Sequence, residues 1–179
     1  MDLNEIRKAI NEIDENMKIL FDKRFICSKE VALTKLSTND QVFKPLREKE
    51  ICERYSDENS KWYLPFVKKV MQISRKYQYS LFEEQNKAKE DFLSKVSEED
   101  LLIYNNGGTL RLKLNCDASC EMGLDVKGIL SLIGDTSLQV TEVVAKENIV
   151  EVNLVVESDN ESKKEALILS YMLYMETVH

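Results

Sequence analysis

Residues 2–36 carry an apolar pattern that neither glycine nor proline interrupts. Apolar side chains recur at alternating three- and four-residue spacing for about four heptads, which predicts a long helix packed lengthwise against another helix. At 1.5 Å per residue this helix is about 50 Å long. The helices predicted after it are much shorter, so one copy of the chain cannot cover the whole stripe, and we expect an antiparallel dimer. The stripe consists of Leu3, Ile6, Ile10, Ile13, Met17, Leu20, Cys27 and Val31.

Two shorter helices are predicted to follow. The polar stretch at 37–40 should end the first helix. Pro45 is favoured at a first helical position and should begin the second, which runs to about Asp57. A third helix covers roughly 60–85, where apolar residues again recur at helical spacing. We therefore predict a helical domain over residues 1–88.

The hydrophobic period changes in the second half of the chain. Alternating apolar and polar residues predict strands, and helical spacing predicts two further helices, in the order β-α-β-β-α. This order is typical of a ferredoxin-like domain without its last strand, unless residues 101–104 supply an additional one. We predict an α+β chain with a small second domain over residues 92–179. The expected elements are strands at 110–116, 138–146 and 149–157 and helices at 124–133 and 161–178.

The charge distribution supports two modules and excludes several classes of partner. Residues 1–90 hold 18 Lys and Arg against 16 Asp and Glu, residues 91–179 hold 7 against 16, and the net charge is −7. Neither half resembles a nucleic-acid-binding surface, and no apolar run reaches the ~20 residues of a membrane span. The amphipathic N-terminus is unlike a signal peptide, so we expect a cytoplasmic protein without membrane or nucleic-acid partners.

The cysteines and the single histidine do not form a metal-binding pattern. Cys116 and Cys120 are close in sequence, but the one histidine is the terminal His179 and no second close cysteine pair is present. A structural zinc site needs four such ligands. We therefore predict no metal ligands.

Polar residues interrupt the apolar faces of the three predicted helices. Arg24 lies on the stripe of the first helix, and Lys35 lies about three turns further along nearly the same face. Glu48 shares a face with apolar residues of the second helix, and Ser74 and Gln78 do so in the third. One such residue usually reaches solvent along its stem. Several in one bundle indicate a polar cavity, because buried polar groups must be satisfied.

Four segments, at this order and spacing, carry a family resemblance: EIRKAINEID, FDKR followed by Lys35, PLREKE and SRKYQ. They resemble the all-helical AroQ-class chorismate mutases over about residues 3–85. The resemblance implies a three-helix subunit in an intertwined homodimer with shared active sites. It also implies an enzyme that rearranges chorismate to prephenate in phenylalanine and tyrosine biosynthesis.

The resemblance further implies roles for individual residues. Arg7 would cross into the partner subunit's active site. The family usually has an aspartate near the substrate hydroxyl at the position of Lys44, so Glu48 must hold that hydroxyl alone. The implied catalytic residues are Arg24, Lys35, Glu48 and Gln78, and the implied substrate-binding residues are Arg7, Val31, Arg47, Met71 and Ser74.

The implied reaction is intramolecular and needs no nucleophile, metal or redox cofactor, so we predict no cofactor. Catalysis must then come from conformation and electrostatics. Arginine forks suit the two substrate carboxylates, and Lys35 and Gln78 would donate to the ether oxygen. Two alternatives are an isochorismate-pyruvate lyase on the same scaffold and a non-catalytic helical dimerisation module.

The second domain resembles no family strongly. Its order of elements is similar to the ACT regulatory fold found beside aromatic-pathway enzymes, and residues 117–123 would lie where that fold binds amino acids. The Pro-Gly usual in that loop is missing. An aromatic amino acid is therefore a candidate effector, and a purely structural module or a second activity are the alternatives. Because the three helices hold every implied site residue, we expect the chemistry not to require this domain.

Overall fold

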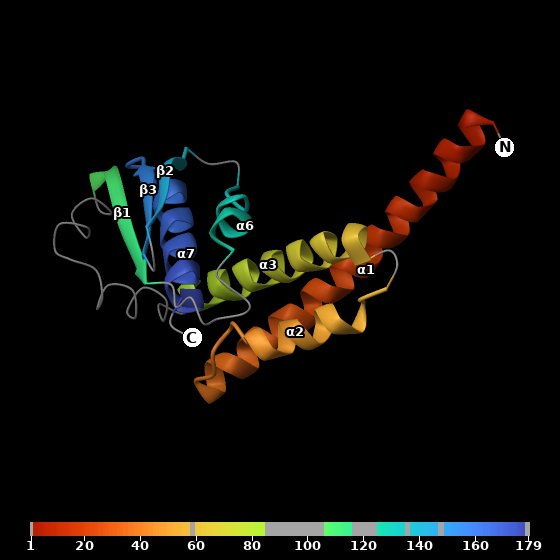
Figure 1. Cartoon of the computed structure of the whole chain (residues 1–179), viewed down its shortest axis with the longest axis horizontal. Coiled ribbons are helices and arrows are strands. Elements are labelled where there is room, and N and C mark those ends of the chain that lie inside the picture. The colour runs from red at the N-terminus through yellow and green to blue at the C-terminus, as the bar shows by residue number, and fades with distance from the viewer. Residues whose placement is uncertain are drawn as a thin grey trace.

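The computed structural model describes residues 2–57, 60–84, 106–115, 125–134, 137–146 and 149–177. Three helices form its N-terminal half: α1 (Leu3–Thr38), α2 (Pro45–Arg54) and α3 (Ser60–Glu84). α3 packs along the C-terminal part of α1, and α2 lies against α3 (Figure 1). These elements agree closely with the predicted helices.

The ends of α1 follow from local chemistry. Asp2 and Glu5 form a capping box, in which each carboxylate accepts a hydrogen bond from the other residue's backbone N–H. At the other end, Asn39 takes a left-handed conformation with φ of 55°, and its backbone N–H reaches the carbonyl of Lys35. The helix therefore begins and ends at residues suited to those positions.

The N-terminal half of α1 extends beyond the rest of the chain (Figure 1). Its apolar stripe is accordingly exposed in a single copy: Ile10 is 49% exposed, Ile13 57% and Leu20 64%. Isolated exposed apolar residues are common, but a continuous stripe of them usually marks an interaction surface.

The C-terminal half contains a three-stranded antiparallel sheet of order β1-β3-β2. β3 (Ile149–Val156) lies between β1 (Gly108–Asn115) and β2 (Gln139–Lys146), and both neighbours run antiparallel to it. β1 and β2 therefore run in the same direction, and α6 (Val126–Leu130) lies in the connection between them. This is the split β-α-β arrangement of ferredoxin-like domains.

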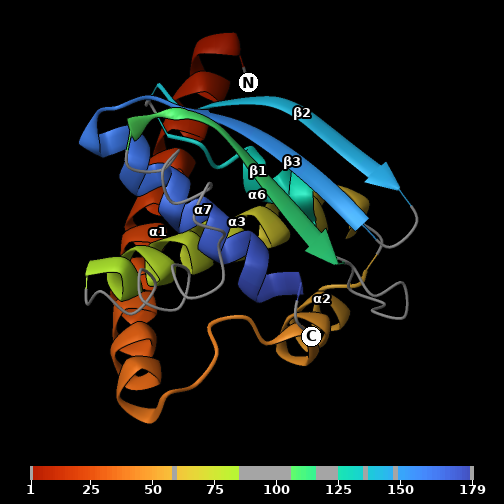
Figure 2. The same cartoon turned by 90° about the vertical axis from the view of Figure 1, so that its left-hand side faces the viewer.

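The last helix, α7 (Asn160–Thr177), packs against both the sheet and α3 (Figures 1 and 2). Nearly all of its apolar residues are buried, as expected for a helix covered on several sides. Tyr79 of α3 contacts Tyr171 of α7 edge to face, with ring centroids 5.4 Å apart. One continuous apolar core thus spans residues of α3, α7 and the sheet.

The α+β class and the order β-α-β-β-α are confirmed. The helix predicted over 124–133 is wrong in length, because α6 ends at Leu130. The backbone N–H groups of Leu132 and Ile133 bond three residues back, which makes a tight turn in place of a further helical turn. The division at residues 88–92, the strand at 101–104, the loop at 117–123, Cys116 and Cys120 lie outside the described residues.

No described helix combines the length and the apolarity needed to cross a membrane.

Candidate active site

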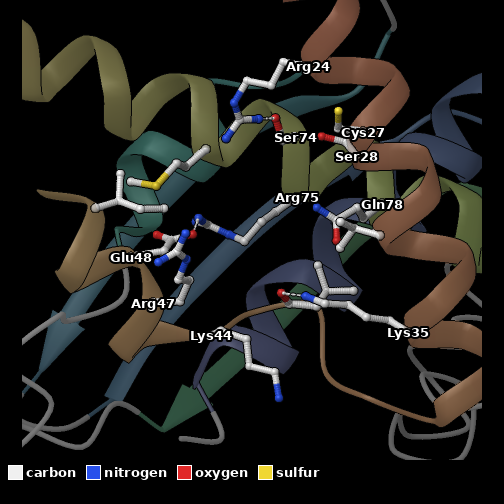
Figure 3. A pocket seen from close by; sticks show the side chains of 14 residues that line it. Arg24, Cys27, Ser28, Lys35, Lys44, Arg47, Glu48, Ser74, Arg75 and Gln78 are labelled. Atoms are coloured by element: carbon white, nitrogen blue, oxygen red, sulfur yellow. Dashed lines mark hydrogen bonds and ion pairs between the residues drawn. The ribbon is translucent and has the colours of Figure 1, made fainter. Parts of the chain in front are cut away.

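A cavity of about 340 Å³ opens between α1, α2 and α3 (Figure 3). All the residues implied for the site line it except Arg7. Arg75 and Lys44 add two cations to this lining, whose one acid is Glu48. The complete lining is Arg24, Cys27, Ser28, Val31, Lys35, Val42, Lys44, Arg47, Glu48, Ile51, Met71, Ser74, Arg75 and Gln78.

α1 supplies two cations to one wall of the cavity. The Arg24 guanidinium donates a hydrogen bond to the Ser74 hydroxyl, and the Lys35 ammonium donates to the Val42 carbonyl at 2.7 Å. Burial lowers the pKa of Arg24 more than the charge of Glu48 raises it. Burial likewise lowers the pKa of Lys35, against an opposing effect of Asp40. Removing these groups from water disfavours their charged forms, and an anionic ligand would restore the balance.

α3 supplies the polar and apolar residues of the opposite wall. Ser74 donates to the Val70 carbonyl at 2.9 Å while it accepts from Arg24. Gln78 is 7% exposed, and its amide oxygen has no hydrogen-bond partner among the described residues. Met71 is 4% exposed and Val31 of α1 is 44% exposed, so these two give the cavity apolar surface. A buried amide oxygen without a partner is uncommon, and it leaves an acceptor in the cavity wall that a donor group of a ligand can meet.

α2 presents the Arg47–Glu48 pair at its N-terminus. Glu48 is largely buried and accepts a hydrogen bond from Arg75. Arg47 is more exposed and pairs with Glu50 on its own helix at 2.9 Å. Lys44 points away from the other labelled side chains (Figure 3) and pairs with Asp40 at 2.5 Å. This exposed Lys44 contact lowers the pKa of Asp40.

Arg75 is a residue of the cavity that the sequence pattern did not indicate. Its side chain reaches across the cavity to Glu48 and is only 8% exposed (Figure 3). Its guanidinium lies 4.9 Å from the ring centroid of Phe43. Arg75 stands beside Lys76 in the sequence, and such a charged pair usually marks a solvated helix face. A useful signal was Glu176, the only charged residue after Glu165 in an otherwise apolar C-terminal segment.

Arg7 does not line the cavity of its own chain. It lies 17 residues before Arg24 on the same helix, which corresponds to about 25 Å along the axis. Its place on the extended half of α1 (Figure 1) therefore separates it from the cavity of its own chain.

The chemistry of the cavity favours a small anion. Its excess of cations over acids attracts negative charge, and arginine forks match carboxylates in particular. Within the described ranges, no group of three or more His, Cys, Asp or Glu side chains is placed to hold a metal ion.

Comparison with known families agrees with this geometry. Residues 6–96 match the model of the family described as chorismate mutase type II. The chain belongs to this family. No curated protein and no solved structure matches the chain. The match to the chorismate mutase family includes every residue that lines the cavity, and Arg7 as well.

Proposed function

We propose that this protein is a chorismate mutase that converts chorismate to prephenate in the synthesis of phenylalanine and tyrosine. The cavity is the observation that carries the proposal. It gathers Arg24, Lys35 and Arg47 around one acid, Glu48, and all four residues lie within the range that matches the family model. A helical module serving only dimerisation would not need these groups to face a common cavity.

The arginines of the cavity are proposed to bind the two carboxylates of the substrate. Chorismate is a dianion, and Arg24 and Arg47 can each bind a carboxylate through a guanidinium fork. Arg47 now pairs with an exposed glutamate on its own helix, and exposed pairs of this kind contribute little to stability. A substrate carboxylate can therefore replace Glu50 at low cost.

Lys35 and Gln78 are the residues proposed to donate hydrogen bonds to the ether oxygen of the substrate. The rearrangement breaks a C–O bond as a C–C bond forms, and negative charge grows on the oxygen. The Lys35 ammonium has three N–H donors, and the Val42 carbonyl accepts from one of them. Gln78 is buried in the wall of the same cavity, and the NH2 group of its side-chain amide supplies two further donors. Donors held in place before the charge develops lower the barrier without reorganisation.

Glu48 is proposed to accept a hydrogen bond from the ring hydroxyl of the substrate. One of its oxygens accepts from Arg75, and a carboxylate has capacity for further hydrogen bonds. Lys44 pairs with Asp40 outside this arrangement. Glu48 would thus hold the hydroxyl without help from the Lys44 position.

We further propose an antiparallel homodimer in which Arg7 of each chain completes the active site of the other. The exposed apolar stripe on the extended half of α1 supports this arrangement. Two copies would bury each other's stripe through an isologous interface. The same contact would carry Arg7 to the partner's cavity, whereas it lies too far along α1 to reach the cavity of its own chain.

The direct test follows chorismate and isochorismate by proton NMR with purified protein, with and without a chelator. We expect prephenate from chorismate at an undiminished rate in the chelator. Pyruvate release from isochorismate, without prephenate formation, would identify the lyase instead. If neither substrate is turned over, the helical domain would instead be a non-catalytic dimerisation module.

A second cavity supports an effector site where the C-terminal half of the chain meets α3. It measures about 520 Å³ and lies between α3 and α6, with Lys61, Lys68 and Asp125 in its lining. A free amino acid carries one carboxylate and one ammonium group, which these side chains can each meet. We propose that an aromatic amino acid binds here.

The effector proposal is tested by adding phenylalanine, tyrosine or tryptophan to the mutase assay. One of them should change the rate, and Lys68→Ala should abolish that response without altering the basal activity. Coupling of about five- to 150-fold is typical of allosteric enzymes. An unchanged rate with all three would indicate a structural role for the domain.

A further inference from the structure

An ion triad connects the C-terminal helix to the candidate active site. Arg75 of α3 donates to both carboxylate oxygens of Glu176 in α7, from Nε at 2.6 Å and from Nη2 at 3.1 Å. Its remaining nitrogen, Nη1, donates to Oε1 of Glu48. Residues from three helices and from both halves of the chain therefore share one guanidinium.

The triad is almost completely removed from solvent. The side chains of Arg75 and Glu176 are 8% and 3% exposed, and that of Glu48 is 15% exposed. Burying two carboxylates with one cation is costly, and well-packed apolar residues would often be at least as stable. α3 and α7 also share a large apolar core, so stability alone is a weak reason for this arrangement.

The geometry suggests a more specific role. Glu176 occupies one edge of the guanidinium in bidentate fashion, which fixes the plane of the group. That plane determines where Nη1 lies, and Nη1 holds Glu48 at the edge of the cavity. The ring of Phe43 lies over the same guanidinium and further limits its rotation.

We propose that the C-terminal domain is a working part of the mutase site, because Glu176 positions Glu48 through Arg75. The inference rests on the proposed function, and it names two positioning residues that act through the carboxylate facing the substrate hydroxyl. It reverses the expectation from the sequence that the chemistry does not require the second domain. A rotation of Glu48 would misplace the hydroxyl, and small misplacements cost rate when catalysis depends on orientation.

A second ion pair between the same helices supplies a matched control. Glu165 of α7 pairs with Lys76 of α3, with side chains 11% and 20% exposed, and also accepts from the Gly134 N–H at 3.1 Å. Lys76 does not line the cavity. Glu165→Gln therefore removes a charge from the same helix and the same interface without touching the triad.

The experiment compares Glu176→Gln with Glu165→Gln in the full-length protein, with thermal unfolding measured for both. We expect kcat/KM for chorismate to fall about tenfold or more in Glu176→Gln and to stay within about twofold of wild type in Glu165→Gln. Equal effects of the two variants would overturn the proposal. An inactive wild-type protein would instead refute the proposed function.

A double-mutant cycle separates positioning from general destabilisation. If Glu176 acts through Glu48, Glu176→Gln should have little further effect in a Glu48→Gln background. If a variant turns over too slowly to assay, the same cycle can be built from the prephenate affinities of the variants, measured by calorimetry. Additive effects would overturn the proposal. If Glu176→Gln does not fold, Arg75→Lys is the variant to measure, because it keeps the positive charge but loses the bidentate fork. Wild-type kcat and KM in Arg75→Lys would also overturn the proposal.

Discussion

Lys35 and Gln78 face the cavity from different helices and are the two groups proposed to meet the charge that develops on the ether oxygen. A donor that strengthens its hydrogen bond only in the transition state affects kcat more than ground-state binding. Lys35→Ala and Gln78→Ala should each lower kcat about a hundred- to a thousandfold, or roughly 3–4 kcal/mol. Steady-state kinetics on folded variants checks this. A raised KM with kcat near wild type would assign the residue to binding alone.

Because the carboxyl group of Glu176 is buried, we predict that the free energy of unfolding depends on pH. Burial raises the pKa of its carboxyl from 4.5 to about 7; Arg75 opposes the rise, and the negative charges of Glu48 and Asp125 add to it. A pKa raised by folding contributes stability that is fully present below 4.5 and is lost as the pH rises through 7. The shift corresponds to on the order of 3 kcal/mol.

Urea unfolding of wild type and Glu176→Gln at several pH values isolates this contribution. The neutral glutamine does not titrate, so the free energy of unfolding of wild type minus that of the variant should decrease between pH 4.5 and 7. A difference that increases with pH would show that the pairing with Arg75 outweighs burial.

The sequence could predict the cavity because its residues break a local pattern. Arg24, Lys35, Ser74 and Gln78 each stand where an apolar side chain is expected, and the structure brings them into one cavity. Arg75 breaks no such pattern. It is buried by Glu48 and Glu176, 27 and 101 residues away, and contacts so distant leave little local trace in the sequence.

At the scale of elements, periodicity predicted helices and strands where the chain repeats clearly. β1 alternates buried Leu110, Leu112 and Leu114 with exposed Arg111 and Lys113. This alternation in the sequence was enough to predict the strand. The way in which the elements pack against one another was harder to predict from the sequence. α7 is buried on nearly all sides, so it has no apolar face that could have indicated its contact with α3.

The exposed stripe of α1 makes the dimer testable. Ile10→Glu places a charge in the middle of the proposed interface, where it would be buried against the partner's stripe, and burying an unpaired charge is costly. We expect this variant to be monomeric by light scattering and to lose most activity. Asn11→Glu adds the same charge outside the stripe and should remain dimeric. A dimeric Ile10→Glu variant would place the interface elsewhere.

At the scale of the whole molecule, the two halves share one core. Tyr79 and Phe82 of α3 are 1% and 2% exposed and belong to the cluster that includes α7 and the sheet. Fully exposing a large apolar side chain costs about 1.5–3 kcal/mol. A chain ending at residue 88 should therefore be poorly soluble or inactive, although its helices hold all the implied site residues. Solubility and mutase assays check this, and a stable, fully active truncated dimer would contradict it.

The proposed sharing of active sites between subunits gives the most quantitative prediction. Arg7 lies on the extended part of α1, and Arg24 lies in the cavity of its own chain. Arg7→Ala and Arg24→Ala should each be nearly inactive, because every site in either homodimer lacks one arginine. In a mixed dimer, one site carries both substitutions and the other carries neither.

Random exchange between equal amounts of the two variants makes about half of the dimers mixed, with one of their two sites intact. Turnover per total site should therefore approach about a quarter of the wild-type value if the sites are independent. Mass spectrometry confirms that exchange has occurred. Confirmed exchange without recovery would mean that Arg7 serves its own chain, and the antiparallel dimer would then no longer account for the length of α1. Recovery near a quarter would mean that neither chain alone holds a complete site.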